Sequence, residues 1–498
     1  MDYFQIGCGL VVVLLAIYYY YKSIYNTWKN RGIPGPQPMF FIGNLFKTAI
    51  KKESMSDCVK KLYDEFKHEP LFGIFAGTSP SIVVNDLDLV KDVLIRNFSI
   101  FVDRGIRTFP KIEPLMQHLF VLEPERWRPM RAKLSPIFTS GKLKEMFLLI
   151  VECAENLEKH LDKVVEDGGS AECRDLAAKF TTDVIGSCAF GINMNALKDE
   201  DSEFRQMGRK IFTPNLKQTL KEICRQFAPW LYGLIGSLLE SKEINDFFTN
   251  LITDSIKCRK ESNVVRPDFV QLLMELQDHP DQMNNIELTD SLLAAQAFVF
   301  FVAGFETSSS TIAHALYELA QHQDIQDKLR QEIREVIKEN IGNLTYNDVK
   351  GMKYLDKVFK ETLRKYPLVP MLTRQAMEDY TFRGTKLTIP KGTNVWIPVI
   401  GIQRDPNIYP KPEDFDPERF TDEAVAARHP MSFLSFGDGP RNCIGARFAV
   451  YQSKIGIITV IRNHKVVVCE KTKIPYESDS NSFLLALKGG VNLKVEKA

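Results

Sequence analysis

Residues 436–445 read Phe-Gly-Asp-Gly-Pro-Arg-Asn-Cys-Ile-Gly, and this stretch decides the fold. Glycine and proline mark it as a turn, and the turn ends at a lone cysteine, Cys443. Residues 444–450 have the periodicity of a helix start. A thiolate here would face the free amides and positive pole of that helix, which lower its pKa and limit the electron density that it donates to a metal. The stretch therefore predicts a metal-binding thiolate at a helix N-terminus.

The residues around Cys443 suit a flat ligand that carries carboxylates. Gly437 and Gly439 have no Cβ, so the backbone can approach a macrocycle, and Arg441 can reach a haem propionate. The alternative is a buried structural cysteine, because free cysteine is among the most buried residue types. The pattern Phe-x-x-Gly-x-Arg-x-Cys-x-Gly fixes the residue at five positions, however, and a chance match is rare. We therefore expect a haem-thiolate loop, with Phe436 and Arg441 at the cofactor and Cys443 as the iron ligand.

This loop resembles that of the cytochrome P450 family, and the resemblance runs from about residue 31 to the C-terminus. The likeness is greatest to insect microsomal enzymes of family 6, at residues 127–136, 138–142 and 303–308. It implies a mainly α fold with a small β-rich lobe and an N-terminal transmembrane helix. It also implies a monooxygenase that inserts one oxygen atom from O2 into lipophilic substrates, which are xenobiotics, plant compounds or endogenous lipids.

Composition excludes several other classes of protein. The chain has 498 residues, 64 basic and 63 acidic, so its charge does not suggest a nucleic-acid binder. We found no zinc-finger, P-loop or repeat signature. The nine cysteines are odd in number, scattered and without a C-x-x-C pair, which is typical of a reducing compartment.

The N-terminus predicts a membrane anchor. Residues 3–21 carry no charge, end in four tyrosines and are about as long as a bilayer-spanning helix. Lys22, Lys29 and Arg31 follow the run and only Asp2 precedes it, so the body should lie in the cytosol. A cleaved signal peptide is disfavoured, because the basic residues lie on the wrong side of the run. We expect residues 1–30 to be the anchor and basic stop-transfer of a single-pass protein of the endoplasmic reticulum. Residues 31–498 would be the catalytic domain, joined to the anchor by a stiff elbow at residues 34–38.

The first third of this domain is expected to hold a lobe and a loop. A helix at residues 56–66 precedes a strand pair at 71–75 and 81–84. Residues 104–121 form a long aperiodic segment, which by resemblance faces the substrate. Trp127 and Arg131 share a helical face, and by resemblance they contact the haem propionates, as does Arg104. An ordinary surface arginine beside a packing tryptophan is the alternative.

The middle of the domain is predicted to be mostly helical. Within residues 147–262, the apolar segment 227–236 either enters the membrane surface or packs as a helix-loop-helix. The helix at residues 288–322 contains Gly304, which weakens it, and Thr307, which can bond back to Ala303. We expect a widened turn there with room for a small ligand. By resemblance Ala303 lies at the cofactor, and Glu306 and Thr307 relay protons to dioxygen; the alternative is a satisfied buried pair.

The last third supplies a structural lock and the pocket wall. After a charged helix at residues 324–341, Glu361 and Arg364 share a face, and by resemblance Arg419 completes a buried trio that holds the thiolate loop. By resemblance Leu368, Val369 and Leu372 line the pocket, Arg374 holds a propionate, and residues 482–487 form the last pocket-facing turn. Strands are expected at residues 386–389 and 395–400.

Electrons must come from another protein, because the sequence has no flavin or nicotinamide fingerprint. The resemblance implies NADPH-cytochrome P450 reductase as donor, with cytochrome b5 as a second candidate partner. Residues that resemble the docking face are Arg128, Lys133, Arg447 and Lys454. The rival functions are a haem-thiolate isomerase or dehydratase that needs no reductase, and a non-catalytic haem sensor in the membrane.

Overall fold

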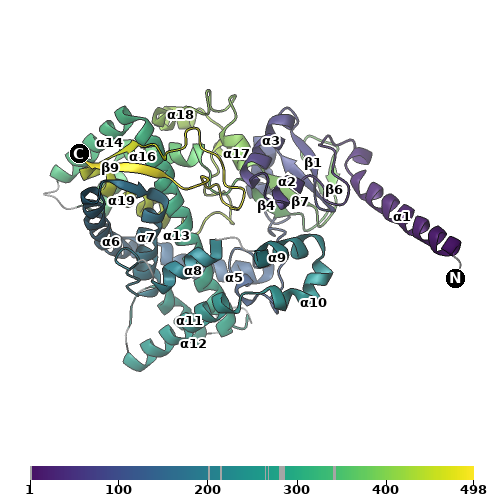
Figure 1. Cartoon of the computed structure of the whole chain (residues 1–498), viewed down its shortest axis with the longest axis horizontal. Coiled ribbons are helices and arrows are strands. Elements are labelled where there is room, and N and C mark those ends of the chain that lie inside the picture. Colours follow the sequence, from purple (N-terminus) through teal and green to yellow (C-terminus); the bar gives the residue numbers. More distant parts are fainter. Residues whose placement is uncertain are drawn as a thin grey trace.

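The computed structural model describes residues 3–199, 202–212, 216–263, 265–266, 268–279, 286–339 and 344–498. These residues form a large helical body, a smaller lobe that contains β-strands, and a single helix, α1 (Tyr3–Tyr25), that projects from the lobe (Figure 1). The expected division into a mainly helical body and a small β-rich lobe is therefore confirmed.

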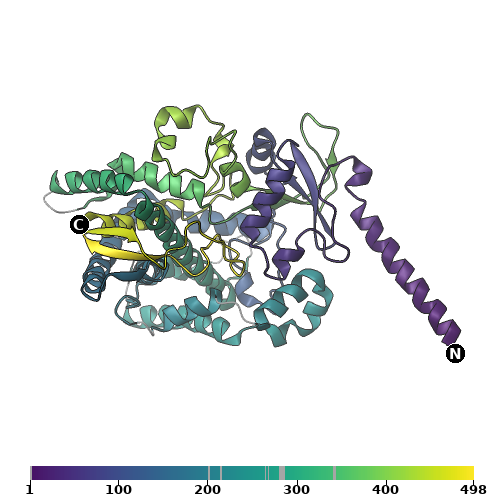
Figure 2. The same ribbon diagram turned by 45° about the horizontal axis from the view of Figure 1, so that its top comes forward.

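Helix α1 stands clear of the rest of the chain in both ribbon views (Figures 1 and 2). Its residues 10–15 are each at least 50% exposed, and with the residues up to Arg31 it is long and apolar enough to cross a membrane. Its C-terminal end is attached to the lobe, because the buried Trp28 donates its Nε1–H to the carbonyl of Ile74 at 3.1 Å. The predicted run at residues 3–21 is thus a helix, extended to Tyr25.

A four-stranded sheet with the order β1-β2-β7-β4 forms the lobe. Strands β1 (Leu71–Ala76) and β2 (Ser79–Val84) make the predicted hairpin, and α3 (Met55–Phe66) precedes it. Strand β7 (Asn394–Ile397) pairs parallel with β2 and antiparallel with β4 (Leu372–Gln375). The sheet therefore joins the pocket-lining segment near residue 372, through β7, to a hairpin about three hundred residues earlier in the chain.

Two predicted strands are shorter than expected. The strand expected at residues 395–400 ends at Ile397, and residues 399 and 400 belong to the helix α17 (Val399–Gln403). Pro398 explains the change, because it has no N–H for the sheet and it precedes the first turn of α17. The strand expected at residues 386–389 is reduced to β6 (Thr388–Ile389), which pairs with β5 (Tyr380–Thr381).

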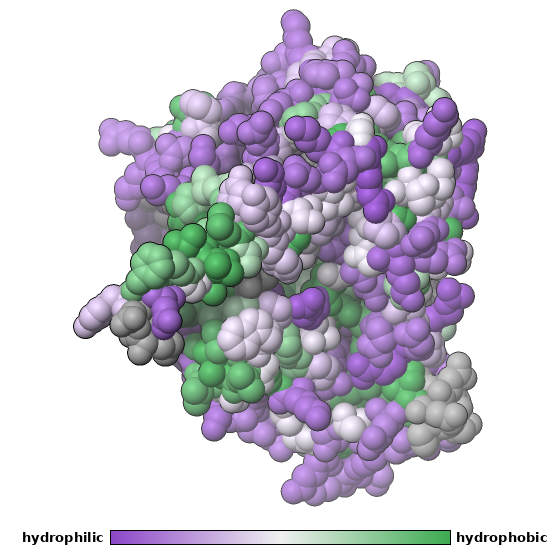
Figure 3. All heavy atoms as spheres, turned by 90° about the vertical axis from the view of Figure 1, so that its right-hand side faces the viewer, coloured by the Kyte–Doolittle hydropathy of each residue, from purple (hydrophilic) through white to green (hydrophobic). Residues whose placement is uncertain are grey.

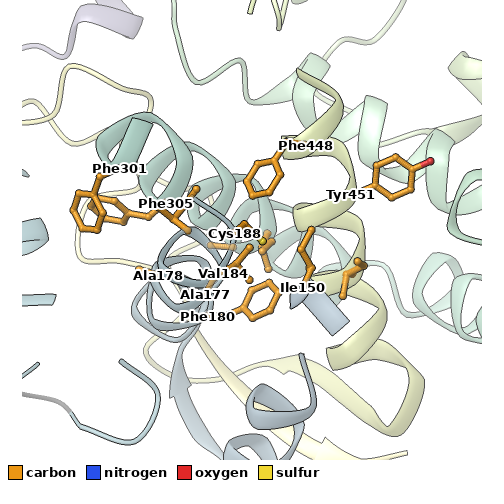
Figure 4. Close-up of a cluster of buried hydrophobic side chains, with 14 of the residues drawn as sticks. Ile150, Ala177, Ala178, Phe180, Val184, Cys188, Phe301, Phe305, Phe448 and Tyr451 are labelled. Atoms are coloured by element: carbon orange, nitrogen blue, oxygen red, sulfur yellow. The ribbon is translucent and has the colours of Figure 1, made fainter. Parts of the chain in front are cut away.

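The helical body is built around α13 (Asp290–Gln321), which is the apolar helix predicted at residues 288–322. It packs against α7 (Cys173–Ile185) and α19 (Ala446–Asn463), and α19 packs in turn on α6 (Ser140–Glu166). Figure 4 shows side chains from these four helices meeting in one buried cluster. Helix α13 is also long and apolar enough to cross a membrane, but most of its side chains are buried, so it is a core helix of the body.

Further helices are α2 (Phe46–Ala49), α4 (Leu87–Lys91), α5 (Pro124–Leu134), α8 (Glu203–Phe212), α9 (Leu216–Phe227), α10 (Pro229–Leu239), α11 (Lys242–Ser262), α12 (Phe269–Asp278), α14 (Gln323–Glu339), α15 (Tyr346–Gly351), α16 (Lys353–Lys365) and α18 (Asp422–Ala426). A sheet with the order β3-β9-β8 joins β3 (Ser170–Glu172), β9 (Asn492–Lys497) and β8 (His464–Val468). Helix α14 is the charged helix predicted at residues 324–341, of which residues 340 and 341 lie outside the described residues.

The apolar segment at residues 227–236 contributes to α10, which has two different faces. Tyr232 and Gly236 are buried, and the Tyr232 ring contacts Phe109 with centroids 4.9 Å apart. Trp230, Leu234 and Leu238 lie four residues apart and are 72–75% exposed. Figure 3 shows the end of the molecule from which α1 projects, where apolar residues form a patch that hydrophilic residues surround. Helix α10 therefore packs on one side and presents an apolar stripe on the other, while the side chain of Phe227 lies outside the described residues.

Candidate active site

A cavity of about 700 Å³ lies inside the helical body. Its wall is contributed by α5, α13, α16, β4, the thiolate loop and residues 104–121, a loop whose only helical turn is Pro114–Met116. The sequence-predicted residues on this wall are Arg104, Trp127, Arg131, Ala303, Thr307, Leu368, Val369, Leu372, Arg374, Phe436, Arg441 and Cys443. Phe483 also lines the cavity, from the turn predicted at residues 482–487. Glu306 does not line it.

Backbone hydrogen bonds shape the loop that carries Cys443. The Cys443 amide donates to the carbonyl of Phe436 at 2.8 Å, and the Asn442 amide donates to Gly439 at 3.0 Å. Gly437 has a φ of 67° and lines the cavity, a position compatible with the predicted approach to a macrocycle. Gly439 has a φ of 73°, but a Cβ there would overlap the carbonyl oxygen of Leu94, so its role differs from the expected one. It allows close approach to Leu94 rather than to a macrocycle.

The electrostatics of Cys443 differ in one respect from the prediction. Burial raises the pKa of its thiol, while a hydrogen bond from the Gly445 amide and the charges of Arg131 and Arg104 lower it. The helix-start amides therefore act in the predicted direction, but the desolvation of the thiol outweighs them in the protein alone. The exposed surface of Cys443 belongs to the wall of the interior cavity.

Four arginines surround the same part of the cavity. Burial, then the charges of Arg374, Arg441 and Arg131, hold the pKa of Arg104 well below its ordinary value. Burial also lowers the pKa of Arg374 and of Arg441 to about 10. Nε atoms of Arg104, Arg374 and Arg441 are buried without a hydrogen-bond partner, and within the described part of the chain no carboxylate forms a salt bridge with any of the four.

Such a cluster fits the two propionates of a haem. Unpaired buried cations are costly, and a carboxylate ligand would supply both counter-charge and hydrogen-bond acceptors. The guanidinium of Arg441 lies 4.2 Å from the centre of the Trp127 ring, which is buried on α5. Arg131 binds the carbonyl and the side-chain Oδ1 of Asn442, both at 2.8 Å. It therefore supports the residue that precedes Cys443 as well as facing the cavity.

On α13 the predicted back-bond is present, but the predicted widened turn is not. Thr307 donates its hydroxyl to the carbonyl of Ala303 at 2.7 Å, and the helix remains α-helical throughout. A Cβ on Gly304 would overlap the side chain of Ile185 on α7. Gly304 is therefore required for close packing of two helices. Next to this contact, the hydroxyl of Thr181 on α7 donates to the carbonyl of Phe305 on α13 at 2.9 Å.

The two members of the predicted acid-alcohol pair have different surroundings. Thr307 is on the cavity wall, whereas Glu306 is buried in an ion pair with Arg174 of α7. Sequence reasoning missed Arg174, because nothing in residues 172–176 forms a motif and the pair is 132 residues apart. The carboxylate of Glu306 is therefore held beside the cavity by a charge from another helix.

The structural lock forms as predicted. Arg364 donates to both carboxylate oxygens of Glu361, at 2.6 and 2.8 Å, and both residues are fully buried. Arg419 lies 3.4 Å from Glu361, and the carboxylate of Glu361 also accepts from the amide of Asp416 at 3.0 Å.

Gln403, which the sequence did not indicate, continues this network to the thiolate loop. Its carbonyl accepts from Arg364 at 3.0 Å, and its side chain accepts from the Leu434 amide at 2.7 Å and from the Ser435 hydroxyl at 3.1 Å. The lock is thus connected through one buried glutamine to the two residues that precede Phe436.

The predicted docking role is wrong for one of the four residues. Lys454 is buried and pairs with Asp356 at 2.7 Å, so it cannot present its charge to a partner. Arg128 and Arg447 are exposed, and Lys133 is half-buried. The sequence could not show that α19 is enclosed at Lys454, because basic residues are usually solvated.

Comparisons with known proteins agree with this geometry. The family model "Cytochrome P450" matches residues 33–493. Probable cytochrome P450 6a14 and cytochrome P450 6a2 of Drosophila melanogaster are each 42% identical, and the alignments cover 98% of both chains. Cytochrome P450 6A1 of Musca domestica is 42% identical over 98% of this chain and 96% of its own. Together with Cys443 on the cavity wall and the buried arginines around it, these matches show that the chain belongs to the cytochrome P450 family.

Proposed function

We propose that the 700 Å³ cavity is the catalytic chamber of this haem-thiolate monooxygenase and that Cys443 is the axial ligand. The observation that carries this assignment is that the Cys443 thiol lies on the cavity wall beside four arginines, of which Arg374 and Arg441 are buried, and that none of the four forms a salt bridge with a carboxylate of the described residues. In the family, haem supplies the redox chemistry by which one atom of O2 enters the substrate, with electrons from a reductase. Arg104, Trp127, Arg131, Arg374 and Arg441 would hold the propionates, and Ala303 and Phe436 would contact the macrocycle.

Thr307 and Glu306 have distinct proposed roles in moving protons. The Thr307 hydroxyl donates its hydrogen bond to the carbonyl of Ala303, so towards the cavity it can act only as a hydrogen-bond acceptor. It can therefore hold a water or a protonated oxygen at the wall. Glu306 is paired with Arg174, and a change of partner between Arg174 and water would let its carboxylate collect a proton for the cavity. The chemistry thus needs Glu306 to leave its ion pair.

The cavity suits lipophilic substrates, which the family takes in general. Ile106, Leu119, Phe300 and Leu368 contribute apolar wall, and so does Phe120, whose ring packs against the guanidinium of Arg104. We propose xenobiotics, plant compounds or endogenous lipids as the substrate range.

The chain is anchored in a membrane by α1, and we propose that this membrane is the endoplasmic reticulum, with the body on the cytosolic side. Lys22, Lys29 and Arg31 follow the apolar run, as the positive-inside rule requires. The apolar stripe of α10 supports a second contact with the same bilayer. On this division residues 1–30 form the anchor and stop-transfer, and residues 31–498 form the catalytic domain.

We propose NADPH-cytochrome P450 reductase as the electron donor, with cytochrome b5 as an additional partner. The exposed Arg128 and Arg447 would contribute to the docking face. The test is substrate oxidation under ¹⁸O2 with reductase and NADPH. We expect one labelled oxygen atom in the product and no product without reductase. Reductase-independent turnover, or oxygen derived from water, would contradict the proposal.

A further inference from the structure

Gln296 is a fully buried polar residue in the second turn of α13, and no step described above uses it. Its Oε1 accepts from the amide of Leu119 at 2.9 Å. Its Nε2 donates to the carbonyl of Gln117 at 3.0 Å and to the carbonyl of Leu292, one helical turn earlier, at 3.1 Å. The carboxamide therefore satisfies the two peptide groups on either side of His118.

These two peptide groups belong to the loop that forms one wall of the cavity. Met116, His118, Leu119, Phe120 and Val121 all line it. The loop has little regular structure of its own, so its position depends on contacts with the rest of the protein. Earlier in the same loop, the buried Glu113 pairs with Lys221 of α9 at 2.8 Å.

The two attachments differ in what they attach to. Lys221 is on a helix that also carries exposed apolar residues, whereas Gln296 is on the core helix around which the body is packed. The attachment to α13 fixes the loop to the same helix that carries Ala303 and Thr307. Helix α13 then sets the distance between the loop and the part of the cavity at Ala303 and Thr307.

We propose that Gln296 is a positioning residue that fixes residues 117–119 against α13 and so determines which atom of a lipophilic substrate is presented for oxidation. This inference rests on the proposed catalytic chamber. It assigns specificity to a residue that is absent from the residues lining the cavity. A glutamine is required because both an acceptor and a donor must be offered from one side chain. Glutamate would keep the acceptor for Leu119 but lose the donor for Gln117, and methionine would lose both while it keeps a similar length.

The experiment compares Gln296→Glu and Gln296→Met with a matched control, Gln326→Met. Gln326 is also fully buried, and it donates to the carbonyls of Leu319 and Val466, both at 2.9 Å, but neither of these partners lines the cavity, whereas Leu119 does. Three measurements are made on each holoenzyme: hydrogen exchange in peptides that cover residues 116–122, the ratio of oxidation products from one apolar substrate, and the carbon monoxide spectrum of the reduced protein.

We expect exchange at the Leu119 amide to be about tenfold or more faster in Gln296→Met, because a buried hydrogen bond is lost, and less so in Gln296→Glu. The product ratio should change in the same order, while the thiolate spectrum remains. Gln326→Met should lower the melting temperature without changing either the loop exchange or the product ratio. Unchanged loop exchange in Gln296→Met would overturn the inference, as would an equal change of product ratio in Gln326→Met. Should Gln296→Met not fold, Gln296→Glu decides on the same two readouts. A wild-type protein without the thiolate spectrum would instead refute the proposed chamber.

Discussion

Replacement of Glu361 by glutamine tests the structural lock. The carboxylate accepts from Arg364 twice, from the Asp416 amide, and lies 3.4 Å from Arg419, with no exposure to solvent. Glutamine keeps the volume but removes the charge and places an N–H2 group against guanidinium donors. The buried Arg364 and the half-buried Arg419 then lose their counter-ion, which typically costs about 3–5 kcal/mol.

This cost can be converted to a melting temperature. An unfolding entropy of about 2.1 cal/mol/K per residue gives roughly 1 kcal/mol/K for a chain of this length, so Glu361→Gln should lower Tm by about 3–5 °C. The control is Glu418→Gln. Glu418 is 48% exposed and pairs with Lys328 at 3.0 Å and Lys357 at 2.6 Å, so its loss should cost less than about 1 kcal/mol.

The assay is thermal unfolding of both variants, followed by the carbon monoxide spectrum of each reduced protein. Because Gln403 connects Arg364 to the residues before Phe436, we expect Glu361→Gln also to bind less haem through Cys443. A Tm within about 1 °C of wild type, or equal shifts in the two variants, would refute the argument that burial makes this ion trio important.

Three further predictions follow from other contacts. Glu306→Gln should consume NADPH with reductase but lower product formation by about 10²-fold, because proton transfer loses its acid; normal coupling of NADPH to product would contradict this. Burial and the charges of Arg174 and Arg404 lower the pKa of His314 to about 3. Below about pH 6.5 the unfolded state therefore binds one more proton than the folded state, and the free energy of unfolding decreases by up to about 1.4 kcal/mol for each unit by which the pH is lowered. His314→Phe, which can keep the stack on Tyr366, should flatten denaturation midpoints between pH 6.5 and 5; an unchanged slope would count against it. Arg447→Glu should slow reductase-supported turnover and spare peroxide-supported turnover, whereas Lys454→Glu should lower Tm, since only Lys454 is buried; equal loss in both assays for Arg447→Glu would refute its docking role.

The parts of the site that depend on short sequence spacing could be predicted. The turn that ends at Cys443, the back-bond from Thr307 to Ala303 and the pair of Glu361 with Arg364 each lie within one or two turns of chain. Local geometry alone decides such contacts, so a motif is enough to indicate them.

The contacts that complete the site could not be predicted, because their partners are far apart in sequence. Arg174 reaches Glu306 across 132 residues, and Gln296 reaches Leu119 across 177. The residues around Arg174 and around Gln296 in the sequence give no sign of these distant partners. The errors have the same origin: the surroundings of Gly439 and Lys454 come from Leu94 and Asp356, which only the packed structure brings near.

The central claim is that Cys443 is the thiolate ligand, and the most direct test is the absorption spectrum of the reduced, carbon monoxide-bound protein. Wild type and Cys443→Ala should be compared at equal folded concentration. We predict a strongly red-shifted Soret band in wild type that is absent in the variant. A Soret band typical of histidine-ligated haem in wild type, or a red-shifted band that persists in Cys443→Ala, would contradict the account.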